Sequence, residues 1–287
     1  MKATAAEFVR GTPEIQSLPE IFERVNRVVA KPSSSSEEIA KVVMQDPGLT
    51  TRLLRLINSS LFSFPGQIDT ISRAISLVGT QQLRDLTLAT CVIEMFEDIS
   101  IEFVDMQSYW RHCLATAVCA RLLAVHCGED NVERFFVAGL LHDIGSIVIY
   151  LRGGRKLKRL MNRCINDHQY LSEAERGIFG FDHADVGREL LQLWGLPDAL
   201  VEAVNAHHTP SRTKRFPRVA NILHVSEFLV EARAMGSNGE HLVAPLNHDA
   251  WLELGLSTDY LPLIYQDLET QWRDAQIELL GSDGSPQ

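Results

Sequence analysis

The sequence predicts an all-α fold, arranged as a two-lobed bundle of many helices, and three observations support this prediction. Apolar residues recur at helical spacing along most of the 287 residues. No sustained alternation of apolar and polar residues lies between hairpin turns, so strands are not expected. Polar caps, prolines and glycines mark where helices begin and end. A chain of this length forms one large domain or two small ones.

The first helices are predicted from short polar pairs. Ser35 and Glu38 form a capping box, in which the serine oxygen accepts the third backbone N–H and the glutamate reaches back. Asp46 is expected to cap the next helix, and Pro47 suits its first position, where an N–H has no partner. The buried stripe of that helix is expected to contain Leu49, Leu53 and Leu56.

Later signals divide the chain. Gly79 is interpreted as a helix stop and Thr80 as the next cap, and Pro197 is expected in the first turn of another helix. The acidic segment 94–105 is expected to separate two helical halves. The expected divisions are a leader (1–15), an N-terminal helical lobe (16–100), a second helical lobe (101–235), a C-terminal helical extension (236–280) and a disordered tail (281–287).

Composition excludes several classes of protein. The chain has 27 Lys and Arg against 37 Asp and Glu, a net charge of −10, which disfavours general binding of nucleic acids. Five cysteines without a CxxC pair, behind an N-terminus without an apolar signal core, indicate reduced thiols in the cytoplasm. The most apolar stretch, 135–151, contains His142 and Asp143, so no membrane anchor is expected.

The segment 138–145, AGLLHDIG, is the strongest candidate for a chemical site. It places the imidazole of His142 beside the carboxylate of Asp143 in an otherwise apolar helix. A buried carboxylate must be paired, hydrogen-bonded or bound to metal. A divalent cation would satisfy it, and the carboxylate could bridge two such ions if further ligands arrive from other helices.

All ten histidines lie at or after His112, and several are candidate ligands. The further donors are His112, His183, His207, His208 and Glu227. His224 shares a helix face with Glu227 and is a competing candidate. Each histidine also has a structural interpretation as a hydrogen-bonded core residue, and His207 could be the exposed neighbour of His208.

These spacings resemble the HD superfamily of metal-dependent phosphohydrolases. The first half is similar to the HDOD family, through Leu18-Pro19, the segment 46–59 (DPGLTTRLLRLINS) and Ala74-Ile75 before LVG at 77–79. The resemblance covers roughly residues 16–230. It implies that a helical lobe precedes an HD-type lobe, and that the protein is a bacterial signal-transduction regulator with signalling proteins as partners.

The resemblance also implies a metal site. Its ligands would be His112, His142, Asp143, His183, His207, His208 and Glu227, with Glu227 where the related phosphodiesterases that carry a GYP motif have an aspartate. One or two divalent ions would bind, iron or manganese being favoured and zinc also compatible. Asp143 would be the catalytic residue if the protein is active.

Two departures from those phosphodiesterases disfavour cleavage of cyclic dinucleotides. Ser146 stands where they have a lysine, and the segment 209–212 replaces the residues that lead to GYP. The leading hypothesis is therefore a regulator that acts through ligand or protein binding. The alternatives are an active metal-dependent phosphohydrolase on a nucleotide-type substrate and a purely structural module.

Two basic runs follow the candidate ligands. Arg155 and Lys156 belong to the first, and Arg212 and Lys214 to the second. They could steer a nucleotide or another small anionic ligand towards the site, or they could form solvated surfaces. The sequence leaves a homodimer open.

Overall fold

The fold is described by a computed structural model for residues 3–62, 64–96 and 99–281. Among these residues the regular structure is helical, and β-type pairing is limited to one isolated bridge between Ile101 and Val104. The all-α prediction is confirmed. The tail predicted to be disordered lies, apart from residue 281, outside the described residues.

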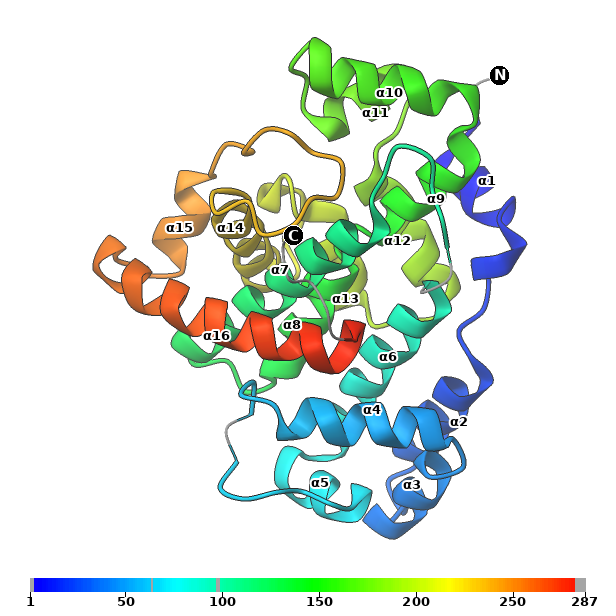
Figure 1. The fold of residues 1–287 in the computed structure, drawn as a ribbon, viewed down its shortest axis with the longest axis vertical. Coiled ribbons are helices and arrows are strands. Elements are labelled where there is room, and N and C mark those ends of the chain that lie inside the picture. The colour runs from blue at the N-terminus through cyan, green and yellow to red at the C-terminus, as the bar shows by residue number, and fades with distance from the viewer. Residues whose placement is uncertain (1–2, 63, 97–98, 282–287) are drawn as a thin grey trace. The chain divides into compact units, whose positions relative to one another are not determined.

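The chain forms two compact units, and each unit combines segments that are distant in sequence (Figure 1). The first unit comprises residues 1–17 and 99–264, and the second comprises residues 18–98 and 265–287. The domain limits expected from the sequence remain a prediction.

Within the described residues, the second unit is built from four helices of 8 to 12 residues, a fifth of 17 residues and part of a sixth. They are α2 (Glu20–Val29), α3 (Ser36–Val43), α4 (Pro47–Asn58), α5 (Ile71–Val78), α6 (Thr80–Phe96) and the part of α16 (Leu261–Leu280) that follows residue 264. Ser35 and Glu38 form the predicted capping box, and Asp46 caps α4 with Pro47 at its start. The predicted leucine stripe of α4 is fully buried.

Two predicted helix starts are shifted by one residue. Gly79 ends α5 with a φ of +92°, a conformation that glycine adopts without strain, but α6 already begins at Thr80, which is therefore not a cap. Pro197 precedes α13, which begins at Asp198. The two shifts run in opposite directions: α6 begins one residue before the expected start, and α13 begins one residue after it, with Pro197 as the N-cap.

The first unit contains the remaining helices. They are α1 (Ala5–Arg10), α7 (Met106–His126), α8 (Val132–Leu141), α9 (Ile144–Gly153), α10 (Arg155–Asn166), α11 (Leu171–Ile178), α12 (His183–Leu193), α13 (Asp198–Ala206), α14 (Pro217–Glu231) and α15 (His248–Glu253). The long helix α7 packs along α8 and α14, and α12 packs against α9 and α13. These six helices bring the candidate ligands together.

One segment of the described chain, Val132–Gly153, is long and apolar enough to cross a membrane by composition alone. It comprises α8 and α9, and 89% of its most apolar window is buried inside the protein. Such burial is what a core helix shows. The expected cytoplasmic location stays a prediction.

Candidate metal centre

Most of the predicted ligands lie at helix ends. His142 follows α8 and Asp143 precedes α9, so these neighbours occupy two cap positions between the helices. His183 is the first residue of α12, and His207 follows α13. Because one helix ends or the next begins at these points, side chains that would diverge on a continuous helix can point into one space.

Two glycines let the helices approach closely enough for this convergence. A Cβ atom at Gly139 on α8 would lie 2.5 Å from the Cα of Ala117 on α7. A Cβ at Gly145 on α9 would lie 2.0 Å from the carbonyl oxygen of His183 and 2.5 Å from the nitrogen of Gly187 on α12. All three distances are too short for any side chain, so these contacts require glycine.

An inner group consists of His112, His142 and Asp143. All three residues are almost completely buried. Oδ2 of Asp143 lies 3.0 Å from Nε2 of His142 and 3.5 Å from Nε2 of His112. One ligand atom from each residue lies within 4.8 Å of the others, a separation at which one ion can be shared.

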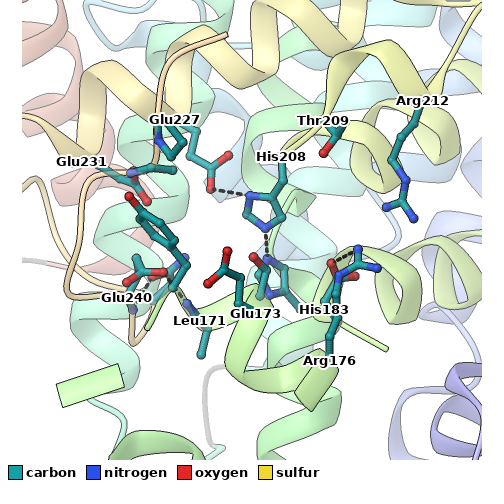
Figure 2. A pocket seen from close by; sticks show the side chains of 16 residues that line it. Leu171, Glu173, Arg176, His183, His208, Thr209, Arg212, Glu227, Glu231 and Glu240 are labelled. Atoms are coloured by element: carbon teal, nitrogen blue, oxygen red, sulfur yellow. Dashed lines mark hydrogen bonds and ion pairs between the residues drawn. The ribbon is translucent and has the colours of Figure 1, made fainter. Parts of the chain in front are cut away.

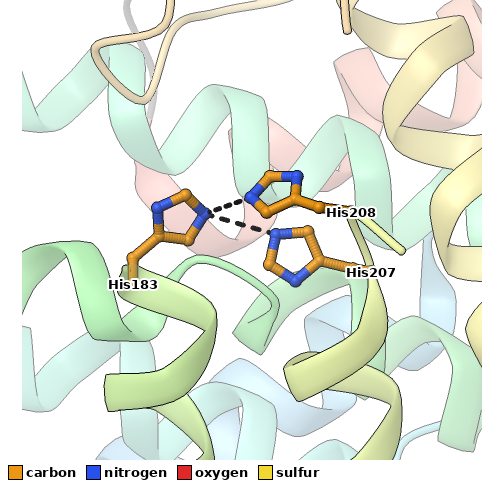
Figure 3. A group of neighbouring side chains, drawn as sticks. All are labelled: His183, His207 and His208. Atoms are coloured by element: carbon orange, nitrogen blue, oxygen red, sulfur yellow. Dashed lines mark hydrogen bonds between the residues drawn. The ribbon is translucent and has the colours of Figure 1, made fainter. Parts of the chain in front are cut away.

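An outer group consists of His183, His207 and His208 (Figure 3). Nε2 of His183 lies 2.8 Å from Nε2 of His208 and 3.3 Å from Nε2 of His207. The second carboxylate oxygen of Asp143, Oδ1, is 3.2 Å from Nε2 of His183. Asp143 therefore faces both groups, one oxygen towards each.

Glu227 reaches the same space from α14. Its Oε1 atom lies 3.9 Å from Nδ1 of His208 and 4.0 Å from Nε2 of both His142 and His207. The residue is 2% exposed. All seven predicted ligands are thus brought together, although their binding of metal is a proposal.

The hydrogen bonds of the imidazoles decide which nitrogens are free. Nδ1 of His142 donates to the carbonyl oxygen of Gly139 at 2.6 Å, and Nδ1 of His207 donates to that of Val204 at 2.6 Å. A carbonyl oxygen can only accept, so each Nδ1 carries the proton and each neutral ring has its lone pair on Nε2. Those Nε2 atoms point into the cluster.

Several buried polar atoms in this cluster have no hydrogen-bond partner among the described residues. They are Nε2 of His112, Nε2 of His142, Oδ1 of Asp143 and Oε1 of Glu227. Leaving even one such atom unsatisfied costs roughly 1–3 kcal/mol, and four share one space here. Unpaired acceptors that converge on a point are the chemistry that a cation satisfies, so these residues fit a metal site.

Burial and mutual repulsion keep several of these rings neutral. Burial, followed by the charge of His142, lowers the pKa of His112 to about 4. Burial and the neighbouring His183 lower the pKa of His207 to about 3. Burial, Glu231 and Asp143 raise the pKa of Glu227 well above its ordinary value, so this carboxyl group must release its proton before it can bind a cation. Neutral imidazole is the form that binds a metal.

Glu175 and Asn238 belong to the site although the sequence analysis missed them. Nδ1 of His183 donates to Oε2 of Glu175 at 2.7 Å, and the backbone N–H of His183 donates to the same oxygen at 2.9 Å. Nδ2 of Asn238 donates to Oδ2 of Asp143 at 2.5 Å. Neither residue lies in a motif, so no signal in the sequence pointed to it.

His224, the competing candidate, is occupied elsewhere. Its Nδ1 donates to the backbone oxygen of His207 at 2.7 Å, and its Nε2 accepts from the backbone N–H of Asn247 at 2.9 Å. Both nitrogens are satisfied, so His224 braces the backbone behind the cluster.

A cavity of about 400 Å³ opens onto the outer group (Figure 2). His183, His208 and Glu227 line it, whereas His112, His142 and Asp143 do not. In Figure 2 the acidic side chains of Glu231 and Glu240 lie on one side of His183 and His208. Arg176 and Arg212 lie on the other side.

The four basic residues expected to meet a ligand are placed differently. Arg212 lines the cavity and lies 3.8 Å from Asp185. Arg155, Lys156 and Lys214 are exposed and do not line it, and Lys156 lies over the ring of Phe179 at 5.4 Å. Arg176, which the sequence analysis missed, lines the cavity and pairs with Asp182.

Solved structures share this architecture. An HDOD domain protein of unknown function from Geobacter sulfurreducens is 27% identical, with a TM-score of 0.74, over 96% of this chain and 95% of that one. A protein named as a candidate phosphohydrolase from Shewanella amazonensis is 22% identical, with a TM-score of 0.73, over 97% and 99% of the two chains. At that identity the second likeness concerns the fold alone.

Curated proteins match over parts of their length. An uncharacterized protein of Treponema pallidum is 25% identical over 214 residues, which are 71% of this chain and 39% of that protein. Ribonuclease Y of Aquifex aeolicus is 31% identical over 114 residues, 40% of this chain and 15% of the enzyme. The chain thus spans well under half the length of these relatives.

The sequence model of the HDOD domain matches residues 15–210. This range includes all of the seven predicted ligands except Glu227, and it covers more than half of the 287 residues. The fold, the matched range and the Geobacter structure agree with the resemblance inferred from the motifs. The chain belongs to the HDOD domain family.

Proposed function

We propose that this protein is a bacterial signal-transduction regulator whose HD-type cluster binds one or two divalent cations and, beside them, a small anionic ligand. The observation that carries the metal proposal is the convergence of buried, unpaired acceptor atoms from His112, His142, Asp143 and Glu227. Without an ion, none of these four atoms has a hydrogen-bond partner among the described residues.

The donor set favours iron or manganese and also accommodates zinc. It consists of imidazole nitrogens and carboxylate oxygens, with no thiolate. His112 and His142 would hold one ion, and His183, His207 and His208 would hold the other. Asp143 would bridge them, since one of its oxygens faces each group.

The cavity supports a phosphate-containing ligand such as a nucleotide. Its volume of about 400 Å³ is in the range of small-molecule sites. Arg176 and Arg212 supply planar guanidinium groups that match phosphate oxygens. The adjoining Glu231 and Glu240 disfavour a ligand that is anionic throughout and suit one with hydrogen-bond donors at its other end.

An active phosphohydrolase is the second candidate, because the ligand cluster is complete and opens onto the cavity. When bound, a divalent cation lowers the pKa of its water to near 7 and so supplies hydroxide. Arg176 and Arg212 would orient the phosphate. Against this candidate stands Ser146, a buried residue at the position where the related phosphodiesterases have a lysine.

Elemental analysis of untagged protein, purified without chelator, tests the metal proposal. The wild type is expected to carry about one or two equivalents of iron or manganese by the ligand count, and Asp143→Ala is expected to carry little or none. Asp167→Ala replaces an exposed aspartate of the same unit and should retain the metal. A wild type that stays free of metal after reconstitution would contradict the proposal.

Turnover separates the regulator from the hydrolase. The metal-loaded wild type would be assayed against a panel of phosphomonoesters and nucleotides, beside Asp143→Asn. Metal and nucleotide binding without turnover is the result expected of a regulator. Turnover that Asp143→Asn abolishes would establish the hydrolase instead.

A further inference from the structure

Residues 235–247, here called the strap, connect α14 to α15 and cross the cluster. Hydrogen bonds from three other parts of the first unit hold the strap. The backbone N–H of Ser237 donates to the carbonyl oxygen of Ser108 at 3.2 Å. The hydroxyl of Tyr150 donates to the backbone carbonyl oxygen of Asn238 at 2.5 Å. Oε2 of Glu240 accepts the N–H of Leu171 at 2.6 Å (Figure 2). The strap is therefore a fixed part of the site.

Two glycines seat the strap directly on the helices below. Gly236 and Gly239 have φ values of +82° and +104°. A Cβ atom at Gly236 would lie 2.4 Å from the backbone nitrogen of His112, and one at Gly239 would lie 2.8 Å from the hydroxyl of Tyr150. Side chains at either position would lift the strap away from the inner group.

The orientation of the Asn238 amide follows from its two partners. Its Oδ1 accepts the backbone N–H of Glu240 at 2.9 Å, which leaves Nδ2 to donate to Oδ2 of Asp143 at 2.5 Å. An amide donor is neutral, so it adds no charge beside the carboxylate. It occupies one lone pair of Oδ2 and leaves the other lone pair to the inner group.

Asn238 also stands between the cavity and the inner group. It lines the cavity while being only 3% exposed, whereas Asp143, to which it donates, does not line the cavity. The outer group is less completely covered: His183 and His207 are buried, but His208 keeps 23% of its side chain exposed and lines the cavity with His183.

We infer that Asn238 is the positioning residue of the bridging carboxylate, and that the strap encloses the inner ion while leaving the outer ion open to the cavity. This inference rests on the two-ion form of the proposed metal centre. Asn238 fixes Asp143 with Oδ2 towards His112 and His142 and Oδ1 towards His183. The two ions should therefore exchange with solvent at different rates.

Manganese release tests this inference. Full-length protein loaded with Mn²⁺ and freed of excess ion is mixed with a chelating dye, and release is followed over time. The wild type is expected to release its ions in a fast phase from the outer group and a slow phase from the inner group. Asn238→Ala should accelerate the slow phase at least tenfold and change the fast phase less than twofold.

The matched control is His241→Ala, an exposed strap residue whose backbone alone makes a hydrogen bond in the structure. Its release should equal that of the wild type. If Asn238→Ala does not fold, as judged by circular dichroism, Tyr150→Phe decides. That variant removes only the hydroxyl that holds the carbonyl of Asn238, and it should also accelerate the slow phase.

Each of the following outcomes would contradict a different part of the proposal. The inference is wrong if folded Asn238→Ala releases its slow ion at the wild-type rate. If Asn238→Ala does not fold, the same result in Tyr150→Phe contradicts the inference. If the wild type releases two ions in a single phase, the strap does not enclose the inner ion. That result would contradict the inference but not the proposed metal centre. A wild type that binds no Mn²⁺ contradicts the metal centre itself, and the inference with it.

Discussion

Gly145 and the carbonyl oxygen of His183 are in such close contact that a Cβ atom on the glycine would lie 2.0 Å from that oxygen. The helix that follows Asp143 and the helix that begins at His183 therefore meet at their backbones. Beside this contact, Oδ1 of Asp143 and Nε2 of His183 lie 3.2 Å apart. The spacing between the inner and the outer group therefore depends on glycine, which has no Cβ atom, at position 145.

Gly145→Ala is expected to destabilise the protein and to weaken metal binding. The added methyl must push α9 away from α12, and overpacking of this kind costs about 1–3 kcal/mol or more. Urea denaturation measures the loss in the free energy of unfolding. Gly153→Ala, in the same helix with its nearest contact at 3.4 Å, is the control and should change stability by less than about 1 kcal/mol. Equal stability of the two variants would show that the helices can separate freely.

Removal of metal should lower the melting temperature. An ion that binds only the folded state stabilises it by about 2.7 kcal/mol when its concentration is 100 times its dissociation constant. Thermal unfolding of chelator-treated protein, with and without added Mn²⁺, measures this shift. The melting temperature of Asp143→Ala should not respond to the ion, and a response equal to that of the wild type would place the ion elsewhere.

Glu175→Gln is expected to weaken metal affinity by about 10- to 100-fold, the usual cost of losing a carboxylate behind a ligating histidine. The carboxylate of Glu175 accepts from both the ring and the backbone of His183 and makes that ring a stronger ligand. Titration calorimetry with Mn²⁺ measures the affinity. Glu189→Gln, on α12 and paired with Arg188, should bind like the wild type. Unchanged affinity in Glu175→Gln would mean that His183 does not ligate.

Thiol modification should be confined to Cys127. Burial raises the pKa of Cys91, Cys119 and Cys164 to about 12. At pH 8 about one in 10⁴ of such thiols is ionised, and only the thiolate reacts. Cys113 is fully buried, whereas Cys127 is partly exposed.

Iodoacetamide labelling read by mass spectrometry should therefore give one adduct on native protein. Its rate should rise with pH, because the thiolate fraction grows as the pH approaches the raised pKa of Cys127. Cys127→Ser should remain unlabelled. Several adducts at similar rates would contradict the buried positions of the other thiols.

Much of the helical framework was predictable because its signals are local. The capping box of Ser35 and Glu38 and the cap at Asp46 involve residues three positions apart, and the structure contains both. Thr80 and Pro197 show the limit of such signals. Each lies one residue from its predicted role, since the exact end of a helix depends on the turn that leads into it.

The sequence by itself determined the all-α fold, the family and the seven candidate ligands, because periodicity, caps and motif spacing are written along the chain. Only the tertiary structure decided which atoms meet. Asn238 lies 95 residues from the carboxylate that it orients. Arg212 reaches the cavity while Arg155 and Lys156 do not. Contacts of this kind follow from helix packing at glycines such as Gly145, and packing between distant segments leaves no local pattern in the sequence.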